Sequence, residues 1–544
     1  MDETTIPVDL VHWILATLSI VALLVFLVPL RWRAPEAGPG AMFVAGLLAF
    51  FAFRTPVTTL AVASAKGVWD AIFILYVMWP ALLLYQITKQ AGGYDALRHG
   101  ISRFSRNELF VILGLGWVFS SFLQGIAGFG APIAVVAPLL LAIGVRPVYA
   151  AAISIIAHAW ARFFGTLGVG WLATLQVADV QDVPRAAFES SLLLLIPTYF
   201  GGLLIVWLYG RWAAVRHAWP LVLILGTILG FGQLVFAFVS PELSTFLAAC
   251  IAMIALYPLS RWRRFSEPVP QSDVPDRPAM DDTATHAQAE SDEPVMSIGM
   301  AFLPYAVLTV VTLGVQLFDP LNNALRQFRI GLPFPEVTTG FGVTNAAVER
   351  YAPFSPLTHP GTMLMVAAIV VWIVYRANGY YAAWGVRHGT ENLGRSLIVD
   401  GVPASLPVIA FLVTSRILDH SGQTIVLAHG IADTAPPLIY AGIASMIGAL
   451  GAFMTSSSTA SNVLFGGLQS DVAQLHSLPV ESIVAAQAAG SAYGNAIGPA
   501  NIVLGTSITG IKGQEGAVMR LAIPWTIIVA ILTGLGTIAL VILA

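Results

Sequence analysis

Phe122–Pro132 reads FLQGIAGFGAP, and Phe453–Asn462 reads FMTSSSTASN. Each stretch interrupts a hydrophobic run that is too long to belong to anything but a membrane-embedded helix, and more than 300 residues separate the two. A helix break inside lipid leaves backbone groups without partners, so it survives only where protein surrounds it or where it lines a wet cavity. Matching breaks in the two halves of a membrane protein indicate the binding site of a transporter.

The composition supports a membrane protein. Of 544 residues, 57% are hydrophobic and 10% are charged, unlike a soluble globular mixture. The single cysteine, Cys250, excludes an intramolecular disulfide. The predicted spans are about 11–30, 40–60, 68–88, 109–145 (a broken pair), 149–175, 187–209, 219–238, 243–260, 298–318, 361–377, 400–418, 434–472 (a second broken pair), 480–508 and 521–543.

The distribution of basic residues predicts the orientation. With the N-terminus outside, the connectors on the cytoplasmic side hold 18 of the 26 lysines and arginines, as the positive-inside rule requires. The first broken pair then starts and ends inside, and the second starts and ends outside. Two similar units of opposite direction are the inverted-repeat plan of secondary transporters. Arms of about 15 residues, against the roughly 20 needed to span, predict re-entrant hairpins.

The predicted fold is therefore an all-α polytopic membrane protein of about 12–14 spans, with two inverted repeats that each hold a re-entrant hairpin and a broken helix. Residues 1–260 form the N-terminal half and residues 298–544 the C-terminal half. Between them, 261–297 is rich in proline and acidic residues, which predicts a disordered cytoplasmic linker. Asp319–Pro360 mixes charges with aromatics and predicts an ordered external loop.

The first break favours an anion site. Its glycines allow close approach of the backbone, and Pro132 can open the next half-helix, whose free N–H groups and positive dipole end suit a carboxylate. The alternative is that the glycines only allow tight helix packing. The second break offers six hydroxyls and an amide within eight positions, which favours a polar cavity lining over hydroxyls that bond to their own helix.

His158 and Arg162 lie four residues apart, on one face of a span, in AHAWARFFGTLG (157–168). An ionisable residue inside a span is a functional candidate, and the arginine fork matches a carboxylate. The glycines beyond Arg162 predict that this helix also unwinds. The alternatives are that Arg162 extends to the membrane interface or pairs with an unidentified acid, and that a neutral His158 bonds to a neighbouring span.

The corresponding segment of the second half is QAAGSAYGNAIGPAN (487–501), in which Pro499 breaks the helix and Asn495 and Asn501 supply amide groups. Asp400 and Asp419 are predicted to lie at span ends. Enzyme signatures are absent: the sequence holds no His-Glu-x-x-His and no Gly-x-Ser-x-Gly, and Ile511 spoils a phosphate loop at 505–512.

These residues resemble the bacterial L-lactate permease family. The resemblance rests on GIAGFGAP (125–132), TASNVLF (459–465), AQAAGSAYG (486–494) and KGQE (512–515), and it extends over nearly the whole length. It implies a carrier of lactate and glycolate in the bacterial inner membrane, with protons as the coupling ion. The chain departs from the family pattern, which commonly has a glutamate at the place of Gln124 and an acid or asparagine at that of Ser458.

The sequence thus predicts proton symport of a small monocarboxylate, with His158 as the proton-coupling residue. The alternative is an uncoupled or sodium-coupled protein for another organic anion, such as a sulfonate. No cofactor, metal or nucleic acid is expected, and homo-oligomerisation stays open. The predicted substrate-binding residues are Gln124, Gly125, Gly128, Phe129, Gly130, Ala131, His158, Arg162, Ser456, Ser457, Ser458, Thr459, Asn462, Asn495 and Asn501.

Overall fold

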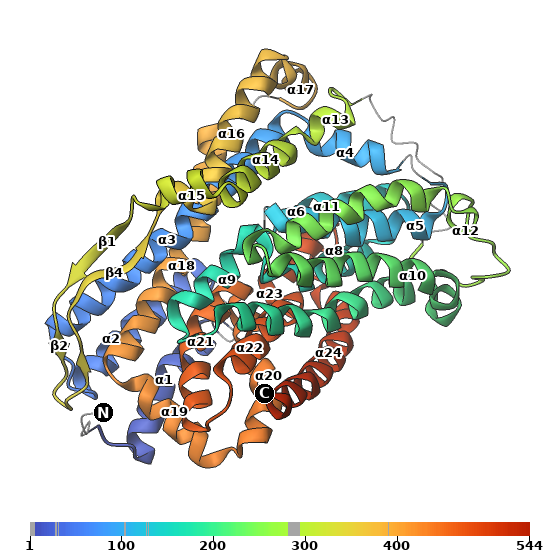
Figure 1. The fold of residues 1–544 in the computed structure, drawn as a ribbon. Helices are drawn as coiled ribbons and strands as arrows, with labels where there is room; N and C mark the ends of the chain where they lie inside the picture. The colour runs from blue at the N-terminus through green and yellow to red at the C-terminus, as the bar shows by residue number, and fades with distance from the viewer. Residues whose placement is uncertain are drawn as a thin grey trace.

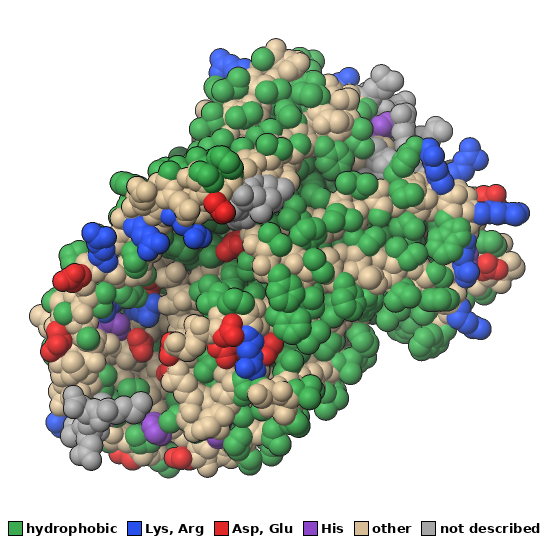
Figure 2. Space-filling model, viewed as in Figure 1, with side chains coloured by type: hydrophobic (Ala, Val, Ile, Leu, Met, Phe, Trp, Pro, Cys, Tyr) green, Lys and Arg blue, Asp and Glu red, His purple; other side chains and the backbone are tan. Residues whose placement is uncertain are grey.

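The structure is a computed structural model that describes residues 6–27, 30, 32–102, 105–126, 128, 130–280, 294–389 and 391–544. It is mostly helical (Figure 1). Nine helices among the described residues are long and apolar enough to cross a membrane. Hydrophobic side chains cover the region of α10 and α24, while lysines and arginines gather at the end that carries α12 (Figure 2).

The first half contains α1 (Leu10–Leu27), α2 (Ala34–Phe51), α3 (Val57–Gln90), α4 (Gly93–Ser102), α5 (Glu108–Ile112), η1 (Leu113–Phe119), α6 (Ser120–Ile126), α7 (Ala131–Ala142), α8 (Pro147–Ile156), η2 (Ala159–Arg162), α9 (Gly165–Val177), α10 (Val183–Ala237), α11 (Pro241–Ser260) and α12 (Arg263–Ser266). The predicted spans 187–209 and 219–238 are the two parts of α10, which bends at Gly210 and Arg211.

The second half contains α13 (Ile298–Ala301), α14 (Leu303–Leu317), α15 (Asp319–Arg326), β1 (Ile330–Phe334), β2 (Val337–Thr338), β3 (Thr344–Asn345), β4 (Val348–Phe354), η3 (Pro356–Thr358), α16 (Pro360–Ala377), α17 (Tyr380–His388), α18 (Leu393–His420), α19 (Gln423–Thr434), α20 (Pro437–Thr455), α21 (Ser458–Leu475), α22 (Val480–Gly494), η4 (Asn495–Ile497), α23 (Pro499–Ile508) and α24 (Glu515–Leu543).

The prediction that the fold is all-α is wrong for the segment between α15 and α16. There β1 pairs antiparallel with β4, and β2 pairs antiparallel with β3. Ile330, Leu332, Val348 and Tyr351 are β-branched, aliphatic or aromatic residues that suit a half-exposed ribbon. The strands lie beside α3, and the Trp69 ring nitrogen donates to the Ala352 carbonyl oxygen at 3.3 Å (Figure 1).

Three of the four hairpin arms are longer than the predicted 15 residues. The first pair consists of a continuous 19-residue segment, Glu108–Ile126, and the 12-residue α7. The second pair consists of α20 with 19 residues and α21 with 18. The polar residues at the second break pack into the helix ends themselves, so the helices extend closer to the break than hydrophobicity alone indicates.

The described part of the predicted linker is folded against the first half. Phe265, Val269 and Val274 are buried. Val274 packs directly against Gly210: a Cβ atom added to Gly210 would lie only 2.4 Å from Cγ1 of Val274. The Arg146 N–H donates to the Ala279 carbonyl oxygen at 2.8 Å. The prediction of disorder therefore remains a prediction only for residues 281–293, which lie outside the described residues.

Two groups of helices position the interior. α3, α16 and α18 run together along one side of the molecule, and α5, α10 and α11 run along the other (Figure 1). α9, α21 and α22 lie between them. The residues of α20 and α22 that meet are small: a Cβ atom on Gly490 would lie 1.9 Å from the Ser445 carbonyl oxygen. Such close helix contact through small residues is typical of membrane proteins.

Candidate anion-binding site at four helix breaks

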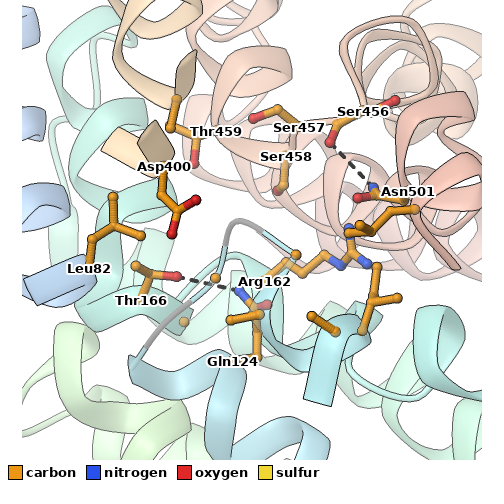
Figure 3. Close-up of a pocket in the computed structure, with 18 of the residues that line it drawn as sticks. Leu82, Gln124, Arg162, Thr166, Asp400, Ser456, Ser457, Ser458, Thr459 and Asn501 are labelled. Carbon is orange, nitrogen blue, oxygen red and sulfur yellow. Dashed lines mark hydrogen bonds between the residues drawn. The ribbon is translucent and has the colours of Figure 1, made fainter. Parts of the chain in front are cut away.

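Four interrupted helices meet at one cavity of about 650 Å³. The interruptions lie between α6 and α7, between η2 and α9, between α20 and α21, and between η4 and α23. Figure 3 shows the cavity with Arg162 and Gln124 on one side, Ser456, Ser457 and Asn501 on another, and Asp400 with Leu82 on a third. Residues far apart in the sequence are thus brought together, as the sequence breaks predicted.

The first break turns at Gly130, whose φ of +86° is a left-handed conformation that glycine adopts without strain. The Ala131 N–H donates to the Gly128 carbonyl oxygen at 3.0 Å and closes this turn. The sequence predicts free N–H groups at this half-helix N-terminus, available to the substrate. That prediction is wrong for Ala131, because the turn uses its N–H.

The helix that carries Arg162 unwinds immediately after it. Thr166, Leu167 and Gly168 have φ values of +52°, +51° and +75°. Two consecutive non-glycine residues in this conformation are strained, and such strain concentrates at functional sites. Thr166 turns its hydroxyl towards Gln124, whose side-chain amide donates to it at 3.5 Å (Figure 3). The predicted unwinding is confirmed.

Arg162 is buried, with 8% of its surface exposed. Its Nη2 donates to the Ile155 carbonyl oxygen at 3.3 Å and to His158 Nε2 at 3.0 Å. Nε has no partner among the described residues, and no carboxylate of the described chain forms an ion pair with this guanidinium. The alternative that Arg162 pairs with an acidic residue for structural reasons therefore finds no support among the described residues.

His158 lies behind Arg162 and is 2% exposed. A guanidinium only donates, so His158 Nε2 must accept from it and carries no proton in this arrangement. Nδ1 lies 3.0 Å from Ser120 Oγ and is the nitrogen that holds the proton. His158 is thus neutral, fixed between α6 and the guanidinium.

The second and fourth breaks are bound to each other. Ser456 adopts a φ of +52° at the end of α20, and its hydroxyl accepts from the Ala500 N–H at 3.0 Å. The Asn501 side-chain amide donates to the Ser456 carbonyl oxygen at 3.3 Å and also contacts Asn495. Ser458 and Ser491 share a hydrogen bond of 2.8 Å. The hydroxyls therefore organise the cavity wall as well as line it.

The ends of the broken helices set the electrostatics of the cavity. α7, α21 and α23 begin at or next to Ala131, Ser458 and Ala500, and the regular part of α9 begins after the unwound segment, at Val169; all four residues line the cavity. The N-terminal end of a helix carries a partial positive charge of about half a unit. Added to the unpaired guanidinium of Arg162, these ends make the cavity favourable for a small anion. The described residues hold no group of three or more His, Cys, Asp or Glu side chains that could bind a metal ion.

A further wall of the cavity comes from two helices that the sequence does not assign to the site. α3 contributes Leu82, Tyr85, Gln86 and Lys89, and α18 contributes Val399, Asp400, Pro403 and Ala404. Gln86 donates to the Asp400 carboxylate at 2.5 Å and joins the two helices. Lys89 lies 3.7 Å from Glu391, so its charge has a partner. The sequence predicts that Asp400 lies at the end of a span, and hydropathy gives no reason to assign it to the cavity.

The predicted site residues that line the cavity are Gln124, Gly128, Gly130, Ala131, His158, Arg162, Ser456, Ser457, Ser458, Thr459, Asn495 and Asn501. Two others do not. Gly125 packs against the backbone of Phe246, and Asn462 lies further along α21, where Gln487 donates to its Oδ1 at 3.3 Å. Phe129 lies outside the described residues. Thr166 lines the cavity without having been predicted, although it stands between the glycines that signalled the unwinding.

Comparison with known proteins identifies the family. The family model of L-lactate permease matches residues 12–544. The chain belongs to the L-lactate permease family. It is a multi-pass membrane permease of a family that resides in the bacterial cytoplasmic membrane, and it is not an enzyme.

Relatives of known function cover nearly the whole chain. The glycolate permease GlcA of Escherichia coli is 27% identical, over 96% of this chain and 94% of its own length. The L-lactate permease of the same organism is 26% identical, over 96% and 95%. The L-lactate permease of Bacillus subtilis is 24% identical, over 92% and 91%. Among solved structures, the YdaH transporter of Alcanivorax borkumensis matches with a TM-score of 0.44 and 15% identity, over 89% of this chain and 87% of its own.

Proposed function

We propose that this permease is a secondary transporter that imports a small monocarboxylate, such as glycolate or L-lactate, by proton symport. The observation that carries the proposal is Arg162, a buried guanidinium without a carboxylate partner among the described residues, on the wall of a cavity where four helices begin. A buried charge without a partner is costly. A substrate carboxylate would supply the missing partner.

The rest of the cavity suits a substrate that also carries a hydroxyl group. Ser456, Ser457, Ser458 and Thr459 line it, together with the amides of Gln124 and Asn501. Hydroxyl and amide groups can accept from a 2-hydroxyl and donate to a carboxylate. The two relatives from Escherichia coli, a glycolate permease and an L-lactate permease, transport acids of this kind by their names.

We extend the proposal to the arrangement of the helices. In the first half, the pair that ends in α7 is followed by the broken helix α8–η2–α9, and in the second half the pair α20–α21 is followed by the broken helix α22–η4–α23. The same order of units in both halves, with all four breaks at one cavity, supports two inverted repeats with re-entrant hairpins. Segment length alone does not distinguish hairpins from crossings, because three arms have 18 or 19 residues.

His158 offers a route for proton coupling. Its Nε2 accepts a hydrogen bond from Arg162. A carboxylate that draws the guanidinium away would free this nitrogen, and the negative charge would favour its protonation. Anion and proton would then bind together, which is symport expressed as linkage.

Thermal stability of the purified protein tests substrate recognition. Glycolate and L-lactate should raise the midpoint of thermal unfolding in a concentration-dependent way, because a ligand that binds only the folded state stabilises it. Glycolamide, which lacks the carboxylate, is the control and should not. If methanesulfonate stabilises the protein and neither hydroxy acid does, the substrate is another organic anion. If uptake into vesicles persists after a protonophore is added but stops when sodium is removed, the coupling ion is sodium and not the proton.

A further inference from the structure

α3 and α18 pack antiparallel and together form one wall of the cavity. Polar contacts join them at several levels, among them Lys66 with His420, Trp79 with Ser405, and Gln86 with Asp400. The cavity reaches the surface at the last of these levels, where Val399 is 61% exposed and the Lys89 side chain is 45% exposed. This is the end that carries α4 and α17, which the predicted topology places in the cytoplasm (Figure 1).

The opposite end of the wall is closed by a mostly buried charged group that we call the outer cluster, made of Lys66, Asp70, Tyr351, Arg416 and His420, with the exposed Asp419 at its edge. Asp70 is fully buried, and its Oδ2 accepts from Arg416 Nε at 2.7 Å and from the Tyr351 hydroxyl at 3.1 Å. Lys66 Nζ lies 3.1 Å from His420 Nε2. Arg416 Nη1 also lies 3.9 Å from Asp419. Tyr351 belongs to β4, so the cluster includes the β-strands at the end that the topology places outside.

Arg416 connects this wall to the helix of the binding site. Its Nη2 donates to the carbonyl oxygen of Gln176, in the last turn of α9. α9 follows directly after Arg162 and its unwound segment, so the contact reaches the element that holds the site. The carbonyl end of a helix carries a partial negative charge, which favours a guanidinium there.

A small second cavity of about 60 Å³ lies beside Arg416. Arg416, Leu418 and Asp419 line one side of it, and Leu464, Gly467 and Asp471 of α21 line another. It therefore lies between the α18 wall and the elements of the binding site, at the closed end. The α3/α18 wall and the helices of the binding site are loosely packed where they meet. The hydrogen bond from Arg416 to Gln176 crosses this boundary.

The two bonds of Arg416 differ in how easily they break. Separating Arg416 from Asp70 would leave a carboxylate buried and unpaired, which is strongly unfavourable. Releasing the Gln176 carbonyl breaks one hydrogen bond to a neutral acceptor at a helix end. If the α3/α18 wall separated from the helices of the binding site, the guanidinium would therefore stay with Asp70 and the bond to Gln176 would open.

We propose that Arg416 is a gating residue of transport, which closes the external side of the path through its bond to the Gln176 carbonyl while the binding cavity is open to the cytoplasm. Asp70 is a positioning residue that keeps Arg416 on the α3/α18 wall. This inference rests on the proposed transport function, since a gate has meaning only for a protein that exposes its site alternately to the two sides.

A cysteine reporter in the cavity tests the gate. With Cys250→Ser as the background, Ala404→Cys places one thiol on the cavity wall. A membrane-impermeant maleimide is applied to right-side-out and to inside-out vesicles without substrate. The reporter should react faster in inside-out vesicles, and Arg416→Gln should raise the external rate about tenfold, as expected when one such bond is lost.

Arg416→Lys provides the second variant. Its ammonium can still pair with Asp70 but lacks the fork that bonds both Asp70 and Gln176, so the external rate should rise to an intermediate value with normal folding. Arg350→Gln, which replaces an exposed arginine of β4, is the control and should leave the rate unchanged. The proposal is overturned if both Arg416 variants label from outside at the wild-type rate, or if the wild type labels equally from both sides. No substrate enters this assay, so failure of substrate recognition would not be confused with failure of the gate.

Discussion

Arg162 and His158 lie one helical turn apart and share a hydrogen bond of 3.0 Å, in which the guanidinium must be the donor. The contact links the residue that would recognise an anion to the residue that would take up a proton. Moving Arg162 away from His158 changes the capacity of the imidazole to accept a proton. Two predictions concern this pair.

Arg162→Gln should weaken binding of glycolate about 10- to 100-fold, because a charge-assisted bond to a carboxylate contributes roughly 1.5–3 kcal/mol. Arg162→Lys should restore the affinity only in part, since an ammonium cannot form two parallel bonds to one carboxylate. Titration of the thermal shift with glycolate measures both variants. Arg329→Gln, which replaces an exposed arginine near the β-strands, is the matched control and should bind as the wild type does. Normal affinity in Arg162→Gln would show that the residue is structural.

His158→Gln should abolish the uptake of protons that accompanies substrate binding while leaving the anion site in place. Glutamine can still accept from Arg162 but cannot gain a proton at neutral pH. The measurement is the pH change when glycolate is added to purified protein in weakly buffered detergent solution. Equal proton uptake by the wild type and the variant would exclude His158 as the coupling residue. If neither takes up protons, sodium becomes the leading coupling ion.

The topology predicts that Ser477 faces outside and that Ser272 faces the cytoplasm. Both are exposed, and each can be replaced by cysteine in the Cys250→Ser background. An impermeant thiol reagent applied to intact cells should label Ser477→Cys and leave Ser272→Cys unlabelled until the membrane is permeabilised. Equal labelling of the two in intact cells would contradict the opposed orientation of the two helix pairs.

Gly490→Ala should lower the free energy of unfolding by about 1–3 kcal/mol, the usual range for overpacking a tight contact. A Cβ atom at this position would lie 1.9 Å from the Ser445 backbone oxygen, so α20 and α22 would have to separate. Gly46→Ala in α2 is the control, because no atom lies within 4 Å of the added carbon. Thermal unfolding in detergent should show a lower midpoint for Gly490→Ala and no decrease for Gly46→Ala. Equal unfolding midpoints for the two variants would show that α20 and α22 can separate at little cost in free energy.

The sequence was most informative where polar residues interrupt hydrophobic runs. The breaks near Gly130, Thr166, Ser456 and Pro499 were all visible, because a cluster of glycines, a proline or a run of hydroxyls inside an apolar segment weakens a helix where lipid offers the backbone no partner. Backbone groups that lack hydrogen-bond partners must be surrounded by protein within a membrane, so the four breaks are expected to meet in the interior.

The same reasoning does not predict which residues of unbroken helices line the cavity. Asp400 and Gln86 enter the cavity because α3 and α18 cross beside the breaks, and hydropathy carries no information on which helix packs where. The polarity of its neighbours predicts that Asn462 belongs to the site, whereas its position further along α21 brings it to Gln487. The β-strands were missed because a short exposed ribbon lacks the regular alternation of a longer strand.

The packing of the linker has a consequence for dividing the chain. Its first part is anchored up to Met280, which bridges to Val145, and the second half begins its contacts at Val295, beside Gly92. A cut placed between residues 281 and 293 would leave both anchors on their own fragments. The permease should therefore assemble from two separately translated polypeptides divided at that point. A cut within 263–280 should instead strip the start of α5 and the bend of α10 at Gly210 of their cover and prevent complementation.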